Sequence, residues 1–299
     1  MAAFTASLSI RPTTSSAASL DYNTAFAFCR LAAGMPDGNT MEIIICVLTA
    51  LLGLCVGSFL NVVIYRVPNG MSIAMPPSHC PKCGYKLKWY DNIPVLSYLI
   101  LGGKCRSCKE PISPRYTIVE LLNMLLWLLF ALSFHDNIFY LVVCCLAAST
   151  LVVIAFIDLE HMLIFDRFQI IMLALGVLAI FADPSVVWWE RLIGFAAGGL
   201  LFFAFYGVAY LVYKQEGMGF GDVKLAAVCG LLLGWKNLIV MVLVASLVGS
   251  VVLLILKFAR KDESKKEYPF APFIALGTVV AMLVGNYIVQ WYLTLCGIA

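Results

Sequence analysis

The sequence predicts an all-α membrane protein with about eight transmembrane helices, and three observations support this fold class. Of the 299 residues, 62% are hydrophobic and only 12% are charged, and the mean hydropathy is +0.95. A soluble globular domain has an apolar share nearer ~45–50%. The hydrophobic residues form long runs, and several of these meet or approach the length of about 20 residues that a spanning helix needs. The basic residues lie mainly between alternate runs, as the positive-inside rule requires of a multi-span chain.

Residues 1–40 are rich in Ser, Thr and Ala and lack a long apolar core. Their apolar patch, residues 26–33, is short and is interrupted by Arg30, so it is a poor match to a signal peptide. We expect residues 1–40 to be a leader that is disordered or non-native, with the core of the protein beginning at Met41.

Residues 41–66 are predicted as the first transmembrane helix, because an apolar run extends from Ile43 to Tyr65. Gly57 and Ser58 permit close packing with another helix. Asn61 has two interpretations, a hydrogen bond to a neighbouring helix or to substrate backbone. We favour the contact with a helix.

Residues 66–117 form the only sizeable polar segment, and the positive-inside rule places it in the cytoplasm. Its eight basic residues are Arg66, Lys82, Lys86, Lys88, Lys104, Arg106, Lys109 and Arg115.

Two Cys-x2-Cys pairs in this segment, separated by 21 residues, are typical of a tetrahedral zinc site. The expected ligands are Cys80, Cys83, Cys105 and Cys108. A reducing cytoplasm favours thiolate ligation over disulfides, although a redox pair is the alternative. Four thiolates leave no open coordination position, so the zinc would be structural, and residues 67–117 are predicted as a small zinc-binding cytoplasmic loop domain.

The segment between the cysteine pairs, residues 89–99, is apolar and aromatic. It is suited equally to lying on the bilayer surface and to forming a small hydrophobic core for the loop.

Residues 118–299 are predicted as a multi-span domain that completes eight spans with both termini outside. The apolar runs are roughly 118–134, 138–157, 168–182, 192–212, 223–234, 237–256 and 270–297. The run 223–234 is too short for a straightforward crossing, so seven spans with one re-entrant segment is the alternative. Charge favours eight, because the loops at 158–167, 213–222 and 257–269 then share the cytoplasmic side with seven basic residues, whereas the opposite loops hold only Arg191 and Lys236.

Two acidic positions at these span ends are candidates for chemistry, because a carboxylate at a membrane boundary is costly. Asp158 directly ends the run Leu141 to Ile157. Of its ionisable neighbours, His161 is expected to be a bystander, Glu160 and Asp166 are expected to be loop charges, and Asp166 is also a candidate N-cap.

Asp222 closes the glycine-dense stretch Gly217-Met218-Gly219-Phe220-Gly221-Asp222. Glycine removes the side chain and permits φ > 0, so an extended peptide can approach Asp222 closely. An N-cap role needs no such glycines. Lys224 is expected either to extend to the membrane surface or to pair with a carboxylate.

Two neighbouring aspartates suit acid/base chemistry, because the pair can share one proton. Two other classes compete with this interpretation. One is an ion or small-solute transporter that uses Asp158 and Asp222 as a cation site, although both aspartates lie at one face and no inverted repeat is evident. The other is a structural assembly factor, in which Asp222 would be dispensable.

From about Met41 onward the chain contains a set of motifs at residues 57–66, 91–98, 112–116, 119–122, Gly219-Phe220-Gly221-Asp222 with Lys224, and 269–273. In these motifs it resembles the type IV prepilin peptidases, bacterial membrane aspartyl proteases of the GxGD kind. Phe165 is a departure, because the family usually has Pro before the acidic residue there.

The resemblance implies a protein of the bacterial cytoplasmic membrane with Asp158 and Asp222 as the catalytic pair. Its substrates would be type IV prepilins or pseudopilins, cut at a Gly-Phe junction on the cytoplasmic face. It further implies N-methylation of the new terminus with S-adenosylmethionine, assigned to the cysteine-containing half, where no Gly-x-Gly-x-x-Gly loop is present. No nucleic-acid partner is expected.

Overall fold

The computed structural model describes residues 40–213, 219–259 and 268–297, and its regular structure is helical. Within these residues eight long helices cover the apolar runs predicted as spans. They are α2 (Thr40–Arg66), α4 (Arg115–Phe134), α5 (Ile138–His161), α6 (Asp166–Ala182), α7 (Trp188–Tyr213), α8 (Phe220–Leu233), α9 (Trp235–Ala259) and α10 (Ala271–Leu295). A 3-10 turn, η1 (Trp89–Asn92), and a short helix, α3 (Leu96–Ile100), lie between α2 and α4. The all-α fold class is confirmed, while the expected leader falls outside the described residues except for Thr40.

In the part of the chain that the structure describes, six helices are long and apolar enough to cross a membrane, namely α2, α4, α5, α7, α9 and α10. The other two, α6 and α8, have only 17 and 14 residues. At a rise of 1.5 Å per residue α8 is about 21 Å long, less than the roughly 30 Å of a hydrocarbon core. It is buried from Asp222 to Leu233 apart from Lys224, so protein surrounds this short helix along most of its length.

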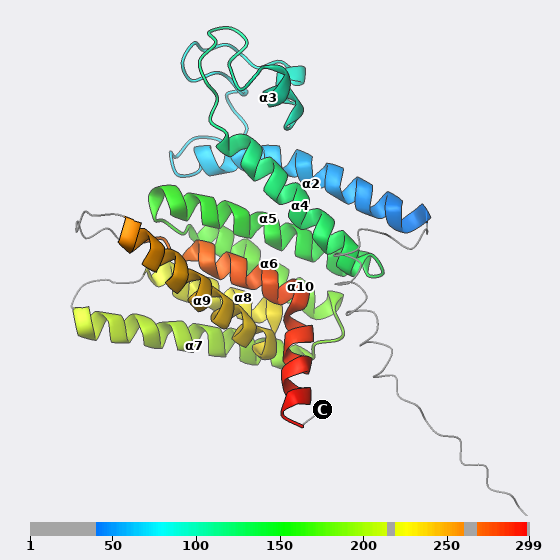
Figure 1. The fold of residues 1–299 in the computed structure, drawn as a ribbon, viewed down its shortest axis with the longest axis vertical. Helices are drawn as coiled ribbons and strands as arrows, with labels where there is room; N and C mark the ends of the chain where they lie inside the picture. Colours follow the sequence, from blue (N-terminus) through cyan, green and yellow to red (C-terminus); the bar gives the residue numbers. More distant parts are fainter. Residues whose placement is uncertain (1–39, 214–218, 260–267, 298–299) are drawn as a thin grey trace, which may run out of the picture. The chain divides into compact units, whose positions relative to one another are not determined.

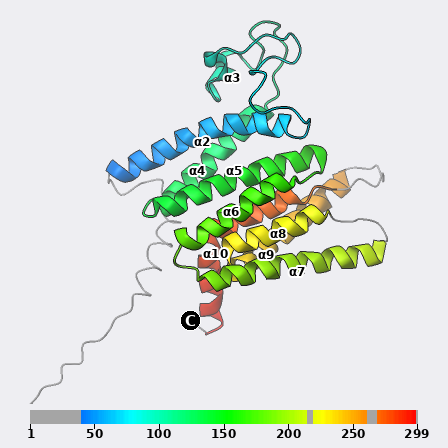
Figure 2. The same ribbon diagram turned by 180° about the vertical axis from the view of Figure 1, so that it is seen from behind.

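The two inner helices are α5 and α8. Figures 1 and 2 show α5 between the α2–α4 pair and α6, and α8 between α6 and α7, with α9 and α10 covering one face. Helix α5 contacts α2, α4, α6 and α10, and α8 contacts α6, α7, α9 and α10. The two aspartates predicted as a pair therefore lie on the two most enclosed elements of the bundle.

Glycines set the closest helix contacts. A Cβ on Gly57 of α2 would lie 2.8 Å from the Glu120 Cα of α4, which confirms the predicted close packing. At the α7–α8 crossing, a Cβ on Gly194 would lie 2.3 Å from the Gly230 carbonyl oxygen, and one on Gly230 would lie 2.2 Å from the Gly194 carbonyl oxygen. Small residues of this kind let membrane helices meet backbone to backbone.

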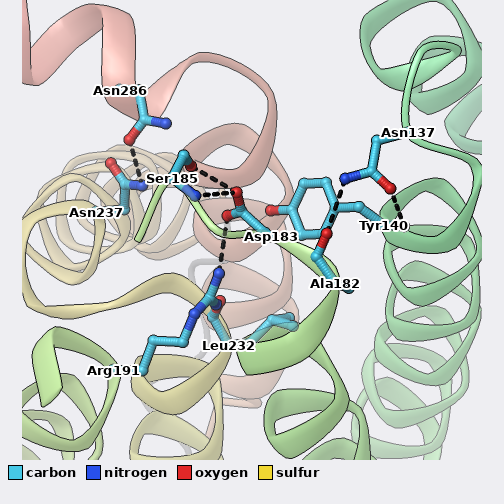
Figure 3. Close-up of polar contacts among 9 residues, drawn as sticks. All are labelled: Asn137, Tyr140, Ala182, Asp183, Ser185, Arg191, Leu232, Asn237 and Asn286. Atoms are coloured by element: carbon cyan, nitrogen blue, oxygen red, sulfur yellow. Dashed lines mark hydrogen bonds and ion pairs between the residues drawn. The ribbon is translucent and has the colours of Figure 1, made fainter. Parts of the chain in front are cut away.

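A polar network joins the helix ends farthest from the two aspartates (Figure 3). The Arg191 side chain is fully buried, donates to the Asp183 carboxylate at 2.8 Å and donates to the Leu232 carbonyl at the end of α8. Asn137, which caps α5, donates to the Ala182 carbonyl at 2.8 Å. Arg191, expected in an outer loop, therefore lies inside α7 and ties the α6–α7 connection to α8.

Candidate active site and metal centre

Asp158 lies one turn before the end of α5 and is buried. Its Oδ2 accepts a hydrogen bond of 3.1 Å from the backbone N–H of Ala271, the first residue of α10. The first N–H groups of a helix have no partner within the helix, so a carboxylate is a suitable acceptor for them. The start of α10 thus holds Asp158 in place.

Asp222 is the third residue of α8 and is 6% exposed. Among the residues that the structure describes, its Oδ1 has no hydrogen-bond partner. The Asp158 and Asp222 carboxylates are close enough for their charges to interact. The structure therefore brings the two predicted residues together in a site buried between α5, α8 and the start of α10.

The glycines before Asp222 differ in their surroundings. A Cβ on Gly221 would lie 3.0 Å from the Ile164 side chain, and the Gly221 carbonyl accepts a 3.0 Å hydrogen bond from Gln169 of α6. Gly221 is therefore enclosed by Ile164 and Gln169 and has no room beside it for a substrate. Gly219 is exposed, and a Cβ there would meet the Asp222 Oδ2 at 3.7 Å, so in the described part of the chain the space beside Asp222 is next to Gly219. Gly217 lies outside the described residues.

The remaining charged residues near the pair hold helix ends together. Lys224 Nζ donates to Asp166 Oδ1 at 2.7 Å, which joins the starts of α8 and α6. The N-cap position of α6 is Phe165 and makes no side-chain cap bond, so the expectation that Asp166 is an N-cap was wrong. Glu160 forms an ion pair with Arg115 at the start of α4, and His161 is exposed at the end of α5.

Two contacts of the site could not be read from the local pattern, the Ala271 N–H bond to Asp158 and the Gln169 bond to Gly221. A weak signal for Gln169 was present, since it is a polar residue at the start of an otherwise apolar run. Ala271 lies inside the motif at 269–273, but only the fold shows that its backbone N–H donates a hydrogen bond to Asp158.

The four predicted metal ligands, Cys80, Cys83, Cys105 and Cys108, form one cluster whose sulfur atoms all lie within 4.8 Å of one another. Sulfur ligands about 2.3 Å from a tetrahedral zinc would be roughly 3.8 Å apart. The Cys80 and Cys108 sulfurs are 3.9 Å apart, so the cluster fits such an ion.

The two cysteine pairs also repeat one backbone pattern. The Gly84 N–H donates to the Cys80 carbonyl at 2.9 Å, and the Lys109 N–H donates to the Cys105 carbonyl at 3.0 Å. Gly84 and Lys109 both have positive φ, at 73° and 59°. Two equivalent turns that present four sulfurs to one point are the expected form of a metal centre.

Polar contacts tie the loop to itself and to the helices. Asp91 is buried and accepts a 2.7 Å hydrogen bond from Arg106. Burial by itself raises the pKa of Asp91, but the hydrogen bonds from Arg106, the Lys88 N–H and Tyr85 outweigh this effect and hold the pKa below its usual value. Glu120 of α4 accepts the Val95 N–H at 2.8 Å, which anchors the segment between the cysteine pairs to the helix bundle.

Asn61 of α2 is buried, and its amide donates to the carbonyls of Gly57 at 3.3 Å and Tyr116 at 2.9 Å. The interpretation of Asn61 as a contact between helices is confirmed. Because Arg115, one residue earlier on α4, pairs with Glu160 at the end of α5, the metal-binding loop and the aspartate pair belong to the same end of the bundle.

Comparisons with known proteins match both halves of the chain. A family described as "Bacterial Peptidase A24 N-terminal domain" matches residues 51–134, and one described as "Type IV leader peptidase family" matches residues 145–254. No solved structure matches the chain significantly.

Among curated relatives, a protein of Aeromonas hydrophila named "Prepilin leader peptidase/N-methyltransferase" is 36% identical over 271 residues, which cover 83% of this chain and 93% of that protein. A protein of the same name from Pseudomonas aeruginosa is 36% identical over 281 residues with the same coverage. One from Myxococcus xanthus is 43% identical over 201 residues, or 67% of this chain and 60% of that protein.

Proposed function

Because this chain belongs to the type IV leader peptidase family, we propose that it is an aspartyl endopeptidase of a bacterial membrane that removes the leader of type IV prepilins or pseudopilins. The observation that carries this proposal is the meeting of Asp158 and Asp222, two buried carboxylates from different helices, with one oxygen of Asp222 free of partners in the described residues. A purely structural pair would be expected to have its oxygens satisfied.

The proposed mechanism uses the two carboxyl groups as a base and an acid that share one proton. The ionised group takes a proton from water, and the water oxygen attacks the carbonyl carbon of the scissile peptide. The protonated group gives its proton to the carbonyl oxygen, and the tetrahedral intermediate then breaks as a proton passes to the leaving nitrogen. We assign the base to Asp158, because the Ala271 N–H stabilises negative charge on it, and the acid to Asp222.

The substrate would reach the pair as an extended peptide beside Gly219, where the surface is open. We propose that the lack of a side chain at Gly217 leaves further room for the substrate. Gly221 lets the start of α8 pack against Ile164, and Lys224, paired with Asp166, fixes the position of this helix end. The scissile bond would be a Gly-Phe junction, as the family resemblance implies. The basic residues of the adjoining segments support a cytoplasmic location of this site.

The second proposed activity is N-methylation of the new amino terminus with S-adenosylmethionine. Support comes from the relatives, whose name includes N-methyltransferase, and from the match of residues 51–134 to the family's N-terminal domain. We propose the corresponding division into the first helix at 41–66, the loop domain at 67–117 and the peptidase domain at 118–299.

We further propose that the four-cysteine cluster holds zinc in a structural role. Four thiolates would complete the tetrahedral shell, so the ion would hold the loop together and would not activate water. The peptide hydrolysis proposed above is assigned to the aspartates alone.

The experiment that tests this function is incubation of the purified protein with a prepilin, with and without S-adenosylmethionine, followed by mass spectrometry. We expect a leader cut at the Gly-Phe junction, and a methyl group on the new terminus only when the cofactor is added. Absence of the cut in folded protein would contradict the proposal and favour the transporter interpretation, which cation-binding measurements on Asp158→Asn and Asp222→Asn would then examine.

A further inference from the structure

The loop between α2 and α4 exposes an apolar surface that nothing in the described residues covers. Helix α3 has no buried residue. Leu96, Leu99 and Ile100 share one face of it and are 49%, 67% and 69% exposed. Trp89 of the adjoining turn η1 is 80% exposed. We call these four residues the loop apolar face. Their exposure argues against the interpretation that the segment forms a hydrophobic core for the loop.

The loop that carries this face is basic. Between Val67 and Pro114 the chain has six basic and two acidic residues. The two acidic residues are already engaged, since Asp91 pairs with Arg106 and Glu110 with Lys82. In the described residues no carboxylate pairs with the exposed lysines Lys86, Lys88, Lys104 and Lys109. An apolar surface on a loop whose lysines have no carboxylate partner is complementary to a bilayer that carries anionic headgroups.

The connections of the loop bring this face to the membrane. The loop joins α2 and α4, both of which are long and apolar enough to span. In Figures 1 and 2, α3 lies on the side of α2 away from α5, at a position between the two ends of α2 in this projection. The hydrogen bond between Glu120 of α4 and the Val95 N–H, immediately before α3, holds the segment in this place. Trp side chains are enriched at membrane–water interfaces, and Trp and Leu are typical of the apolar face of helices that lie in the interface.

We propose that the loop apolar face inserts into the bilayer interface and that the exposed lysines of the same loop bind anionic lipid headgroups. The metal-binding loop is then a membrane-docked element beside the spanning helices. This inference does not depend on the proposed enzymatic function.

The test is photo-crosslinking of the full-length protein in lipid nanodiscs, with p-benzoylphenylalanine replacing Leu99 or Ile100. Glu110, on the same loop but outside the face, is the negative control position, and Leu125, an exposed residue of spanning helix α4, is the positive one. A single symmetric peak in size-exclusion chromatography and an unchanged melting temperature would verify that each variant is folded. We expect lipid adducts at positions 99 and 100 at a level near that of position 125 and several-fold above that of position 110.

The result would overturn the proposal if position 125 gave lipid adducts while positions 99 and 100 gave none, or if these two positions crosslinked to an added prepilin or to a second copy of the chain in place of lipid. The headgroup contribution has its own test. Adducts should increase when phosphatidylglycerol is added to phosphatidylcholine, and the triple variant Lys86→Gln, Lys88→Gln, Lys104→Gln should lose this increase. If lipid adducts of the triple variant still increased with phosphatidylglycerol as in the unaltered protein, the proposal that the lysines bind anionic headgroups would be overturned.

Discussion

At the scale of single residues, Asp222 differs from the other buried carboxylates of the described residues, because one of its oxygens is buried without a hydrogen-bond partner. The Asp183 carboxylate is bonded to Arg191 and Ser185, and the Asp91 carboxylate to Arg106. In both cases a basic partner offsets the cost of burial. Asp222 instead faces another carboxylate and has no basic partner in the described residues. Two neighbouring buried carboxylates without a basic partner lower the stability of the fold. Ionisable groups in such unfavourable surroundings are concentrated at functional sites, so this arrangement is typical of a catalytic site.

The first prediction concerns this pair. Asp158→Asn and Asp222→Asn keep the size of the side chain but remove the shared proton, so each should lower the rate of leader cleavage by about 10³-fold or more. The measurement is prepilin cleavage by purified protein of unchanged thermal stability. His161→Ala, at the same end of α5 but exposed, is the matched control and should retain most of the activity. Near-normal cleavage by Asp222→Asn would exclude the aspartyl mechanism.

The second prediction concerns Arg191. Replacing it with Met removes the donor to Asp183 Oδ2 and to the Leu232 carbonyl, and removing one partner of a buried pair typically costs about 3–5 kcal/mol. We expect a clear fall in the melting temperature of the detergent-purified protein.

The control for Arg191 is Lys236→Met. Lys236 pairs with Glu190 at 2.8 Å, but its side chain is 46% exposed, and such pairs contribute about 0–1 kcal/mol. Equal destabilisation by the two substitutions would show that burial of the Arg191 pair has no special effect on stability.

At the scale of helices, the α7–α8 crossing depends on the absence of two side chains. Gly230→Ala would place a methyl group 2.2 Å from the Gly194 carbonyl oxygen, a distance that forces the helices apart. Because α8 carries Asp222, we expect both lower thermal stability and slower cleavage. Gly207→Ala, elsewhere on α7, has nothing within 4 Å of the new methyl group and should change neither. Equal behaviour of the two variants would contradict the close crossing.

The fourth prediction concerns the metal-binding loop. Cys105→Ser removes one of four thiolates and should release the zinc, as measured by elemental analysis of freshly purified, reduced protein. Cys55→Ser, at an exposed position of α2, is the control and should keep a full equivalent of metal. Absence of zinc from the unaltered protein would contradict the proposed metal centre.

At the scale of the whole molecule, the sequence predicts where each helix begins and ends. It does not predict which helices pack against one another. Each apolar run became a helix whose ends differ from the run by a few residues, because a span is a contiguous signal in the sequence. The aspartates and cysteines were predictable for the same reason, since each lies at the boundary of a run or in a local motif.

The contacts that complete the site are not local. The bonds between Ala271 and Asp158, Lys224 and Asp166, and Gln169 and Gly221 join residues separated by 113, 58 and 52 positions. Periodicity indicates which face of a helix is apolar but contains no information on which helix will cover it. For the same reason the burial of Arg191 was missed, because an arginine at the end of an apolar run usually remains at the surface.

The last prediction concerns the orientation of the bundle in the membrane. The end that carries Asp158, Asp222 and the metal-binding loop should face the cytoplasm, because the basic residues of the chain concentrate there and the buried Arg191 adds no loop charge to the other end. Alkaline phosphatase fused after Asp136 or after Ser185 should be active, since the enzyme folds only outside the cytoplasm, whereas a fusion after Leu163 should be inactive. Fluorescent protein at the same three positions should give the opposite pattern. Active phosphatase after Leu163 would place the aspartate pair outside the cytoplasm, where the leader of an unprocessed substrate could not reach it, and would contradict the orientation proposed here.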